Sequence, residues 1–386
     1  MANNNKHTGP NVPALRFPEF SGEWIESKLG DIADFSKGAG ISKDQRSEEG
    51  NPCILYGELY TRYKSEVIAN VFSKTALPDS NLVKSKANDI IIPASGETAE
   101  DIATARCVPF DNILLGGDLN IIRLHEQDGK FFSYQLNGVR KYDIATVAQG
   151  VSVVHLHAGD LKGITVKYPS HIAEQEKISQ ILGLIDDRIA TQSKIIEELK
   201  TLRSALLEKV FQVSNPTLEV GAIAHQTSER NKLCRYSNVL SVSNRFGFIN
   251  QSEQFEDRNV ASDDVRNYKV VHRGDFAYNP ARINVGSIAM LKNFESGIVS
   301  PMYICFQVDD TIVDPSFFEL FLETKAFKDE MEIRLEGSVR RCLSFEALCE
   351  IHLPRPALLV QRSISDKIGN ISSKIKLEDR ILRSYI

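Results

Sequence analysis

The chain has 386 residues, 46 of them basic and 51 acidic, so its formal net charge is −5. Hydrophobic residues make up 42% and charged residues 25%, which excludes disorder as the main state and indicates two or three globular domains. No run of 18 apolar residues occurs, which excludes a membrane span. The polar segment 1–11 lacks the apolar stretch of a signal peptide, so we expect a disordered tail and a cytoplasmic protein.

The second half of the chain repeats the first. Residues 174–197 resemble residues 360–383 at a constant offset of 186, with Ile178 matching Ile364 and Gly183 matching Gly369. Further matches at about this offset are Asn88-Asp89 with Gly274-Asp275, Pro169 with Pro354, 150–152 with 337–338 and, after a small drift, 29–33 with 220–224. The sequence therefore predicts two copies of one unit, each a domain followed by a long helix.

We expect a first domain over residues 1–170, a central helix over 171–213, a second domain over 214–357 and a C-terminal helix over 358–386. Short apolar or alternating runs at 89–92, 112–115, 119–122, 297–299 and 302–308 predict strands, and 315–331 predicts a helix. The expected fold class is α+β, with two similar domains separated by two long helices.

Both predicted helices carry a narrow apolar seam with alternating steps of four and three residues, which favours an antiparallel coiled coil. The seam residues are Ile178, Leu182, Ile185, Ile189, Ile196, Leu199, Ile364, Ile368, Ile371, Ile375 and Leu382. We expect the first four to pack against the four isoleucines from Ile364 to Ile375. Gln192 and Arg203 interrupt the first seam and Glu378 interrupts the second. The alternative is two amphipathic helices, each packed on its own domain.

Five segments carry a family resemblance. The opening residues LRFPEFSGEW (15–24) and KLGDI (28–32) resemble the start of a type I restriction-modification specificity subunit. The segment IPASGETAEDI (92–102) resembles one class of the family's target recognition domains, and YNPARINVGSI (278–288) resembles another. The segment EQEKI (174–178) is similar to the family's central conserved helix.

The resemblance implies a DNA-recognition subunit that is not itself an enzyme. Each target recognition domain would recognise one half of a split site on double-stranded DNA. The paired helices would set the gap and dock two methyltransferase subunits, and restriction subunits could then join. This chain would bind no cofactor, whereas S-adenosylmethionine and ATP would bind to the partner subunits. By the offset of 186, the second helix is about three turns shorter than the first, which departs from the family pattern.

Two other functions are weighed against this one. A coiled-coil adaptor would use both domains to bind proteins. A self-contained adenine methyltransferase would need a glycine turn and a (N/D)-P-P-(Y/F) loop; residues 34–40 and Asn279–Arg282 resemble these only superficially. There is no P-loop, and the pairs Glu48-Glu49 and Asp263-Asp264 are expected to be surface charges.

Metal and disulfide sites are not expected. The six cysteines are scattered without a C-x-x-C pair. His155 and His157 lack Cys, Asp or Glu at ligand spacing, so we expect them on one face of a half-exposed strand rather than around zinc.

Neither predicted domain is basic, because residues 12–170 hold 17 basic and 21 acidic side chains and residues 212–357 hold 16 and 20. DNA contacts are therefore expected from local clusters beside loops. The expected DNA-binding residues are Arg62, Tyr63, Lys64, Lys84, Lys86, Ser95, Glu97 and Thr98, and then Arg230, Lys232, Arg245, Asn279, Arg282, Asn284, Arg340 and Arg341. Pro280 should end a strand and leave Arg282 in a loop, where it could bind guanine or a phosphate; a surface salt bridge is the alternative.

Overall fold

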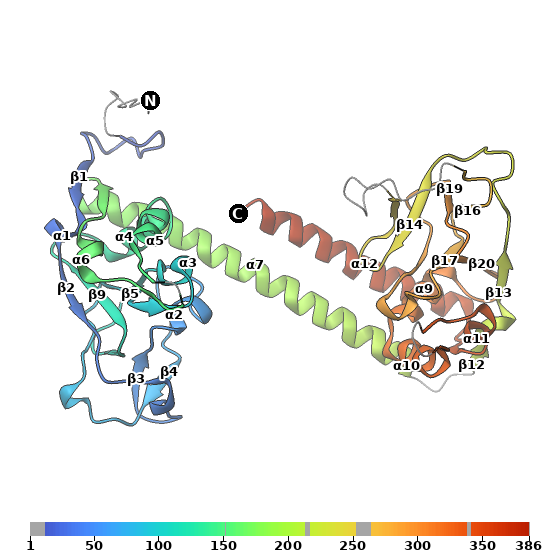
Figure 1. The fold of residues 1–386 in the computed structure, drawn as a ribbon, viewed down its shortest axis with the longest axis horizontal. Helices are drawn as coiled ribbons and strands as arrows, with labels where there is room; N and C mark the ends of the chain where they lie inside the picture. The colour runs from blue at the N-terminus through green and yellow to red at the C-terminus, as the bar shows by residue number, and fades with distance from the viewer. Residues whose placement is uncertain (1–11, 151, 213–216, 252–263, 338–340, 386) are drawn as a thin grey trace. The chain divides into compact units, whose positions relative to one another are not determined.

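The computed structural model describes residues 12–150, 152–212, 217–251, 264–337 and 341–385 (Figure 1). It divides the chain into two compact units, with the boundary between Ala190 and Thr191. The expected tail over 1–11, Asp263 and Arg340 lie outside the described residues. No described helix is long and apolar enough to cross a membrane.

The centre of the first unit is a four-stranded antiparallel sheet in the order β2-β9-β5-β7. All five residues of β5 are buried, as its Asp-Ile-Ile-Ile-Pro sequence predicts for a central strand. Its strands are β2 (Ala33–Lys37), β9 (Leu119–Leu124), β5 (Asp89–Pro93) and β7 (Arg106–Val108). Helix α4 (Gly129–Asn137) packs against β5 and β7 and closes one face of the core.

Shorter elements surround this sheet. A second sheet has the order β4-β3-β8, and β6 pairs with β10. The remaining short elements are β1 (Ile25–Lys28), α1 (Leu29–Ile32), η1 (Lys43–Gln45), β3 (Asn51–Ile54), α2 (Glu58–Thr61), β4 (Ser73–Thr75), η2 (Asp79–Asn81), β6 (Ser95–Gly96), α3 (Ala99–Ile102), β8 (Leu114–Leu115), α5 (Lys141–Val147), β10 (Val154–His155), α6 (Ala158–Lys162) and β11 (Thr165–Tyr168). The long helix α7 (Ile172–Gln212) follows them and continues into the second unit.

The second unit contains two four-stranded sheets, in the orders β13-β20-β17-β18 and β15-β14-β19-β16. Its elements are β12 (Thr217–Glu219), η3 (Val220–Ala222), β13 (Ala224–Thr227), β14 (Val239–Ser243), β15 (Gly247–Asn250), β16 (Lys269–His272), β17 (Phe276–Tyr278), η4 (Ile283–Val285), β18 (Ile288–Met290), β19 (Ser296–Val299), β20 (Ile304–Val308), α9 (Pro315–Glu323), α10 (Lys325–Arg334), α11 (Phe345–Cys349), β21 (His352–Pro354) and α12 (Leu358–Arg383). Its core is rich in phenylalanine, with Phe276, Phe306 and Phe318 fully buried.

The two units begin and end in the same way, which confirms the internal repeat. The first strand of each unit pairs antiparallel with the last, β1 with β11 and β12 with β21. Gly30 and Gly221 follow these first strands, and a Cβ on either glycine would lie within 3 Å of the side chain of Lys162 or Cys349. Both glycines are therefore needed for close packing against the short helix that precedes the last strand.

A hydrogen-bonded junction fixes each long helix to its domain. In the first unit, the Asp128 backbone amide donates to Gln175 at 3.0 Å, and the Ser179 hydroxyl donates to the Asp128 carboxylate at 2.6 Å. Asp128 also caps the N-terminus of α4. In the second unit, the Asp314 backbone amide donates to Gln361 at 2.9 Å, and the Ser365 hydroxyl donates to the Asp314 carboxylate at 3.0 Å. Asp314 also caps α9. We call these triads the first and second junction.

Helix α12 runs antiparallel to the part of α7 that lies in the second unit. The Gln192 side chain donates to Glu378, and Arg203 Nε donates to the Ser372 hydroxyl at 2.8 Å. Position 192 thus lies opposite 378 and position 203 opposite 372, which makes the pair antiparallel as expected.

The expected register of this helix pair is wrong. Ile364 and Ile368 pack with Leu207 and Phe211 in the second core, whereas Ile178 packs against the core of the first domain. The repeat offset identifies equivalent positions, and equivalent positions move apart along an antiparallel pair, so the contact between Gln192 and Glu378 does not extend to the isoleucines.

Two further expectations need correction. The expected helix over 315–331 is two helices, because buried Thr324 leaves the helical conformation and caps α10 by accepting from the Phe327 amide. His155 and His157 do not share a strand, since β10 ends at His155 and His157 precedes α6. Among the described residues, no group of three His, Cys, Asp or Glu side chains is placed to hold a metal ion.

Candidate nucleic-acid interface

Two exposed loops occupy equivalent places in the two units. Strands β5 and β17 each lie between two antiparallel neighbours, and each begins after a turn with positive φ, at Asn88 (80°) and Gly274 (93°). The loops after these strands cover residues 94–98 and 279–286 and overlap at the repeat offset. Segments 92–102 and 278–288, which resemble two classes of target recognition domain, therefore include equivalent loops of the two units.

The first of these loops is held by side-chain hydrogen bonds. Ser95 is 8% exposed and its hydroxyl donates to Asp118 at 3.1 Å, so its role here is to hold the loop. Thr98 caps α3 through the Asp101 amide at 3.1 Å, and its hydroxyl donates to the Asp101 carboxylate at 2.8 Å. Glu97 is exposed between them. The side chains left to meet a ligand are therefore those of Glu97 and, in part, Thr98.

Tyr60 joins this loop from α2. A Cβ built on Gly57 would lie 3.7 Å from its hydroxyl, and a Cβ built on Gly96 would lie 3.9 Å from it. Burial is the main cause of its raised pKa, and the carboxylates of Asp101 and Glu97 raise it further. Tyr60 therefore remains a neutral hydrogen-bond donor and acceptor near physiological pH. The sequence interpretation overlooked this residue, although it sits in the Gly57–Tyr63 run next to the chosen cluster.

The second loop leaves two polar side chains available. The Asn279 carboxamide is 9% exposed and accepts from the Ala281 amide at 3.1 Å, so it stabilises the loop. Arg282 is exposed and its backbone donates to Asn279 at 2.9 Å. Within the described part of the chain, no carboxylate pairs with the Arg282 guanidinium, so the surface salt bridge considered for it is not formed. Asn284 is exposed on the same loop.

A β-hairpin lies against this second loop. Strands β14 and β15 are joined by Asn244, Arg245 and Phe246, with Ser243 paired to Gly247. The Ser287 hydroxyl donates to the Val242 carbonyl at 2.9 Å, which ties the loop to the hairpin. Phe246 is 63% exposed at the tip, and the Arg245 guanidinium lies 5.3 Å from the centre of its ring. The second unit thus brings Arg282, Asn284 and Arg245 onto neighbouring segments.

The predicted cluster of Arg62, Tyr63 and Lys64 in the first unit contains one buried and two exposed side chains. Arg62 stacks 4.4 Å above the Phe72 ring and pairs with Glu58 at 3.6 Å. Tyr63 is 4% exposed, and burial raises its pKa to about 12, so it is a core residue rather than a DNA contact. Lys64 is exposed.

Lys84 and Lys86 are separated from the first loop. Both are exposed and precede β5, whereas Ser95–Thr98 come after it. A strand of five residues at about 3.3 Å per residue places its two ends roughly 16 Å apart. The structure therefore does not join these lysines to the loop in one small site.

In the second unit, Arg341 is already paired. Its guanidinium contacts the Glu332 carboxylate and donates to the Glu332 carbonyl at 2.9 Å. The Arg230 side chain donates to the Asn267 carbonyl at 2.6 Å, and Lys232 is exposed nearby. These contacts leave Lys232 more available than Arg230 or Arg341 for a phosphate.

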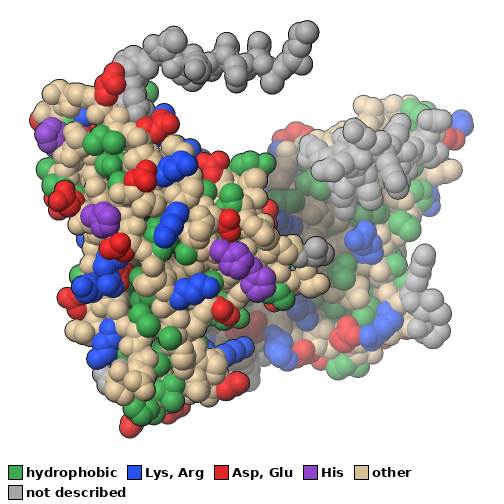
Figure 2. All heavy atoms as spheres, turned by 60° about the vertical axis from the view of Figure 1, so that its left-hand side comes forward, with side chains coloured by type: hydrophobic (Ala, Val, Ile, Leu, Met, Phe, Trp, Pro, Cys, Tyr) green, Lys and Arg blue, Asp and Glu red, His purple; other side chains and the backbone are tan. Residues whose placement is uncertain are grey.

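The face of the first unit seen in Figure 2 carries mixed charge. In the view of Figure 2, Lys and Arg side chains on the first unit are interspersed with Asp and Glu. This agrees with the acidic balance of both domains in the sequence. Recognition by these units must depend on particular loop side chains rather than on a strong net field.

The glycines at the methyltransferase-like segment 34–40 have a packing role. A Cβ on Gly38 would lie 2.0 Å from the Gly116 carbonyl oxygen, so the chain can pass there only without a side chain. The segment begins within β2 and does not lead into a helix that could cradle a cofactor phosphate. This resemblance to a cofactor-binding turn therefore comes from close backbone packing.

The fold and the paired loops define a class: a protein with two similar α+β recognition domains on an antiparallel helix pair. Residues 21–201 match the family model described as type I restriction modification DNA specificity domain. The chain is 23% identical to the type I restriction enzyme MjaVIII specificity subunit of Methanocaldococcus jannaschii over 401 aligned positions, which cover 94% of the chain and 89% of that relative.

Two solved structures share this fold. The type I restriction-modification S subunit from M. genitalium is 17% identical with a TM-score of 0.61, covering 97% of this chain and 95% of that one. A chain from a study of complex assembly and conformational transition of the type I R-M system is 13% identical with a TM-score of 0.50, covering 96% and 95%. The family match over residues 21–201 and the likeness to specificity subunits over nearly the whole chain agree with the resemblance found in the sequence.

Proposed function

We propose that each unit recognises one half of a bipartite DNA site, through the loop after β5 in the first unit and the loop after β17 in the second. The observation that carries this proposal is the equivalence of these two loops in two repeats. Arg282 and Asn284 have side chains suited to bidentate contacts with guanine and adenine. Glu97 and Thr98 can accept or donate at base edges in the same way.

The residues proposed to contact DNA fall into two groups. The residues that reach base edges are Tyr60, Glu97, Thr98, Arg282 and Asn284, and the phosphate-binding residues are Arg62, Lys64, Lys84, Lys86, Arg230, Lys232 and Arg245. Tyr63, Ser95, Asn279 and Arg341 are assigned to structural roles, because each is buried or already bonded.

The helices serve as the scaffold for partner subunits in this proposal. Two methyltransferase subunits would dock on α7 and α12, and restriction subunits would join the assembly. S-adenosylmethionine and ATP would bind to those partners, and the complex would act on DNA in the cytoplasm. The units of this chain supply donors and acceptors for DNA, and every bond-breaking step is assigned to the partners.

The experiment is methylome sequencing of a host strain with and without this chain. A split motif that is methylated only when the chain is present is the expected result. Filter binding with cognate methyltransferase subunits provides the second measurement, because a protein-binding adaptor would give no sequence preference. Turnover of S-adenosylmethionine by the purified chain alone would instead support an autonomous methyltransferase.

Modularity can be tested in the same host. Replacing residues 215–357 with the second recognition domain of another family member should change one half of the methylated motif and leave the other half unchanged. A change in both halves would contradict the assignment of one half-site to each unit.

A further inference from the structure

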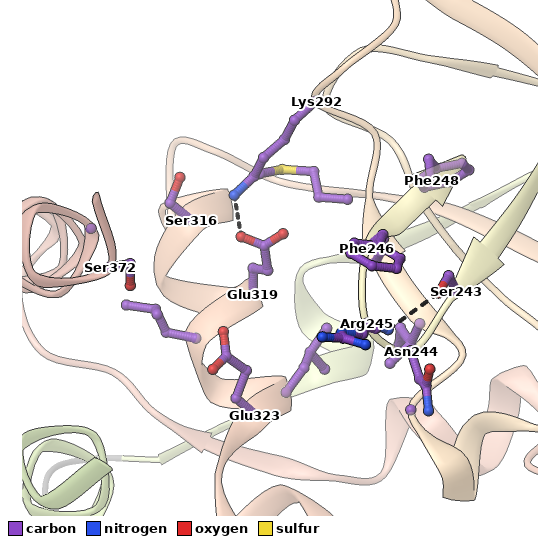
Figure 3. A pocket seen from close by; sticks show the side chains of 18 of the residues that line it. Ser243, Asn244, Arg245, Phe246, Phe248, Lys292, Ser316, Glu319, Glu323 and Ser372 are labelled. Carbon is purple, nitrogen blue, oxygen red and sulfur yellow. Dashed lines mark hydrogen bonds and ion pairs between the residues drawn. The ribbon is translucent and has the colours of Figure 1, made fainter. Parts of the chain in front are cut away.

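The second unit contains a polar cavity of about 850 Å³ beside the β14–β15 hairpin (Figure 3). Its walls are the hairpin, α9 and α12, with Arg245, Ser316, Lys328, Gly369 and Lys376 among the lining residues. We call it the helix–hairpin groove. Figure 3 shows Arg245 projecting from the hairpin into the groove, opposite Ser316, Glu319 and Glu323 on α9.

The groove carries excess positive charge. Five basic and two acidic side chains line it. Lys292 pairs with Glu319, and Arg203 pairs with Glu323 at 2.8 Å, which neutralises both carboxylates. Among the described residues, no carboxylate pairs with Arg245, Lys328 or Lys376. A domain that is acidic overall thus gathers three unneutralised cations around one cavity, which points to an anionic ligand.

The wall formed by α12 lets a ligand approach closely. Ser365, Gly369, Ser372 and Ser373 line the groove, so short side chains flank Lys376 on this wall. A Cβ added at Gly369 would meet nothing within 4 Å. The cavity therefore has room for a rigid ligand, and its charged and hydroxyl-bearing walls do not favour an apolar protein surface.

The groove adjoins the recognition loop of the same unit. A Cβ on Gly286, at the end of that loop, would lie 3.2 Å from the Asn244 side chain in the hairpin. Gly286 itself lines the groove, so the hairpin and the end of the Arg282 loop form one continuous wall. A duplex held by the Arg282 loop has its backbone within reach of the groove.

We infer that the helix–hairpin groove binds the phosphodiester backbone of the DNA next to the half-site recognised by the second unit. This contact is independent of base sequence, and it rests on the proposed DNA-recognition function. Lys328, Lys376 and Arg245 neutralise phosphates that flank the recognised bases.

The first test uses two substitutions at one position. Gly369→Glu places a carboxylate in the groove, whereas Gly369→Gln places a neutral side chain of the same size there. The assembled complex with methyltransferase subunits is measured by fluorescence anisotropy against a cognate duplex and duplexes with scrambled half-sites. Relative to Gly369→Gln, Gly369→Glu should weaken binding of all duplexes by about tenfold or more, because like charges then face each other.

The second test measures salt dependence. The double variant Lys328→Ala/Lys376→Ala should lower the slope of log affinity against log salt by about two units, one for each lost phosphate contact. Lys367→Ala is the matched control, because Lys367 is exposed on α12 but does not line the groove. The preference for the cognate half-sites should be unchanged in both variants.

The outcomes separate the inference from the function on which it rests. If the wild-type complex shows no preference for cognate half-sites, the proposed DNA recognition fails. If it shows that preference but Gly369→Glu binds like Gly369→Gln, or the double variant keeps the wild-type slope, the groove inference is overturned. Loss of assembly with Gly369→Glu alone would also overturn it, because the groove would then receive a partner protein.

Discussion

Gln192 donates a hydrogen bond from its side-chain amide to the backbone carbonyl of Glu378 at 3.1 Å, and the two residues are one repeat length, 186 positions, apart. Gln192 also contacts the Glu378 carboxylate, and both residues are buried. This buried polar pair therefore fixes the register of α12 against the part of α7 that lies in the second unit.

Replacing Gln192 should destabilise the helix pair. Gln192→Leu removes a hydrogen-bond donor from the buried Glu378 carboxylate. We therefore expect the free energy of unfolding to fall by about 1–3 kcal/mol. Lys374 still pairs with Glu378 at 2.6 Å in this variant. The double variant Gln192→Leu/Glu378→Leu should recover most of that loss, since it removes both buried polar groups together. Calorimetric unfolding measures both changes. A double variant as unstable as the single one would contradict the account of this pair.

The two junctions should be equivalent but independent. Gln175 is 2% exposed and Gln361 is fully buried, and each bonds to the aspartate that caps a domain helix. Gln175→Ala should lower the stability of the first unit, and Gln361→Ala that of the second, by about 1–3 kcal/mol each. Hydrogen exchange assigns each loss to its unit. The exposed neighbours Gln180→Ala and Arg362→Ala serve as controls, and equal losses in both units from one variant would refute independence.

Stability of the first unit should depend on pH through Glu66. Burial, and then the nearby carboxylate of Asp186, raises the pKa of Glu66 in the folded state above its ordinary value of 4.5. A carboxyl with a raised folded pKa binds its proton more tightly when folded, so stability falls as pH rises from 4.5 through the folded pKa. Glu66→Gln should therefore raise the free energy of unfolding at neutral pH.

The pH dependence of the stabilisation by Glu66→Gln provides the control. The gain from Glu66→Gln should shrink as the pH approaches 4.5, where Glu66 takes up its proton in the wild-type fold. Urea titrations at several pH values measure it. A loss of stability at neutral pH would show that the Glu66–Arg106 ion pair, at 3.8 Å, outweighs the cost of burying this carboxylate.

The repeat, the strand positions and the long helices could be predicted from the sequence because they depend on local patterns. β5, β9 and β19 fall where apolar runs predict them, and α7 follows its seam. The two junctions were not predicted from the sequence. Their residues are nevertheless identical at the repeat offset, since Asp128 matches Asp314 and Gln175 matches Gln361. Their signal lies in polar residues, which a search for apolar periodicity ignores.

Whether a polar side chain is available to contact DNA depends on tertiary packing, which local sequence patterns do not encode. Tyr63 and Lys64 are neighbours in one basic-looking cluster, yet one is buried and the other exposed. Arg341 and Arg282 both come after turn-forming residues, but among the described residues only Arg341 meets a carboxylate, which belongs to α10. Contacts of this kind join elements far apart in the chain, so charge clustering alone could not separate structural from available residues.

The length of α7 should set the gap between the half-sites. Inserting four residues after Asp187 in this unbroken helix adds about 6 Å and rotates the C-terminal part of the helix by about 40°. Since DNA rises about 3.4 Å per base pair, the methylated motif should gain one or two gap positions while both half-sites keep their bases. Inserting seven residues preserves the heptad phase and should add about three. An unchanged gap in an active complex would refute this role.

The strongest single test of base recognition is Arg282. Its guanidinium is exposed on a loop whose backbone is held by Asn279 and Ser287, so truncation should leave the fold intact. If Arg282 contacts a base, Arg282→Ala should cost about 1–3 kcal/mol of affinity and relax one position of the motif. Arg282→Lys keeps the charge but cannot form the bidentate contact, so it should relax the same position.

Affinities measured with single-base variants of the site at two salt concentrations distinguish a base contact from a phosphate contact. A phosphate contact would weaken binding to all sequences alike and lower the salt slope by about one unit, and Arg282→Lys would largely restore both. We expect the base-specific pattern, because Arg282 lies on the loop equivalent to residues 94–98 of the first unit and no carboxylate among the described residues holds it back. Unchanged affinity and slope would remove Arg282 from the interface and leave Asn284 as the remaining candidate for a base contact in the second unit.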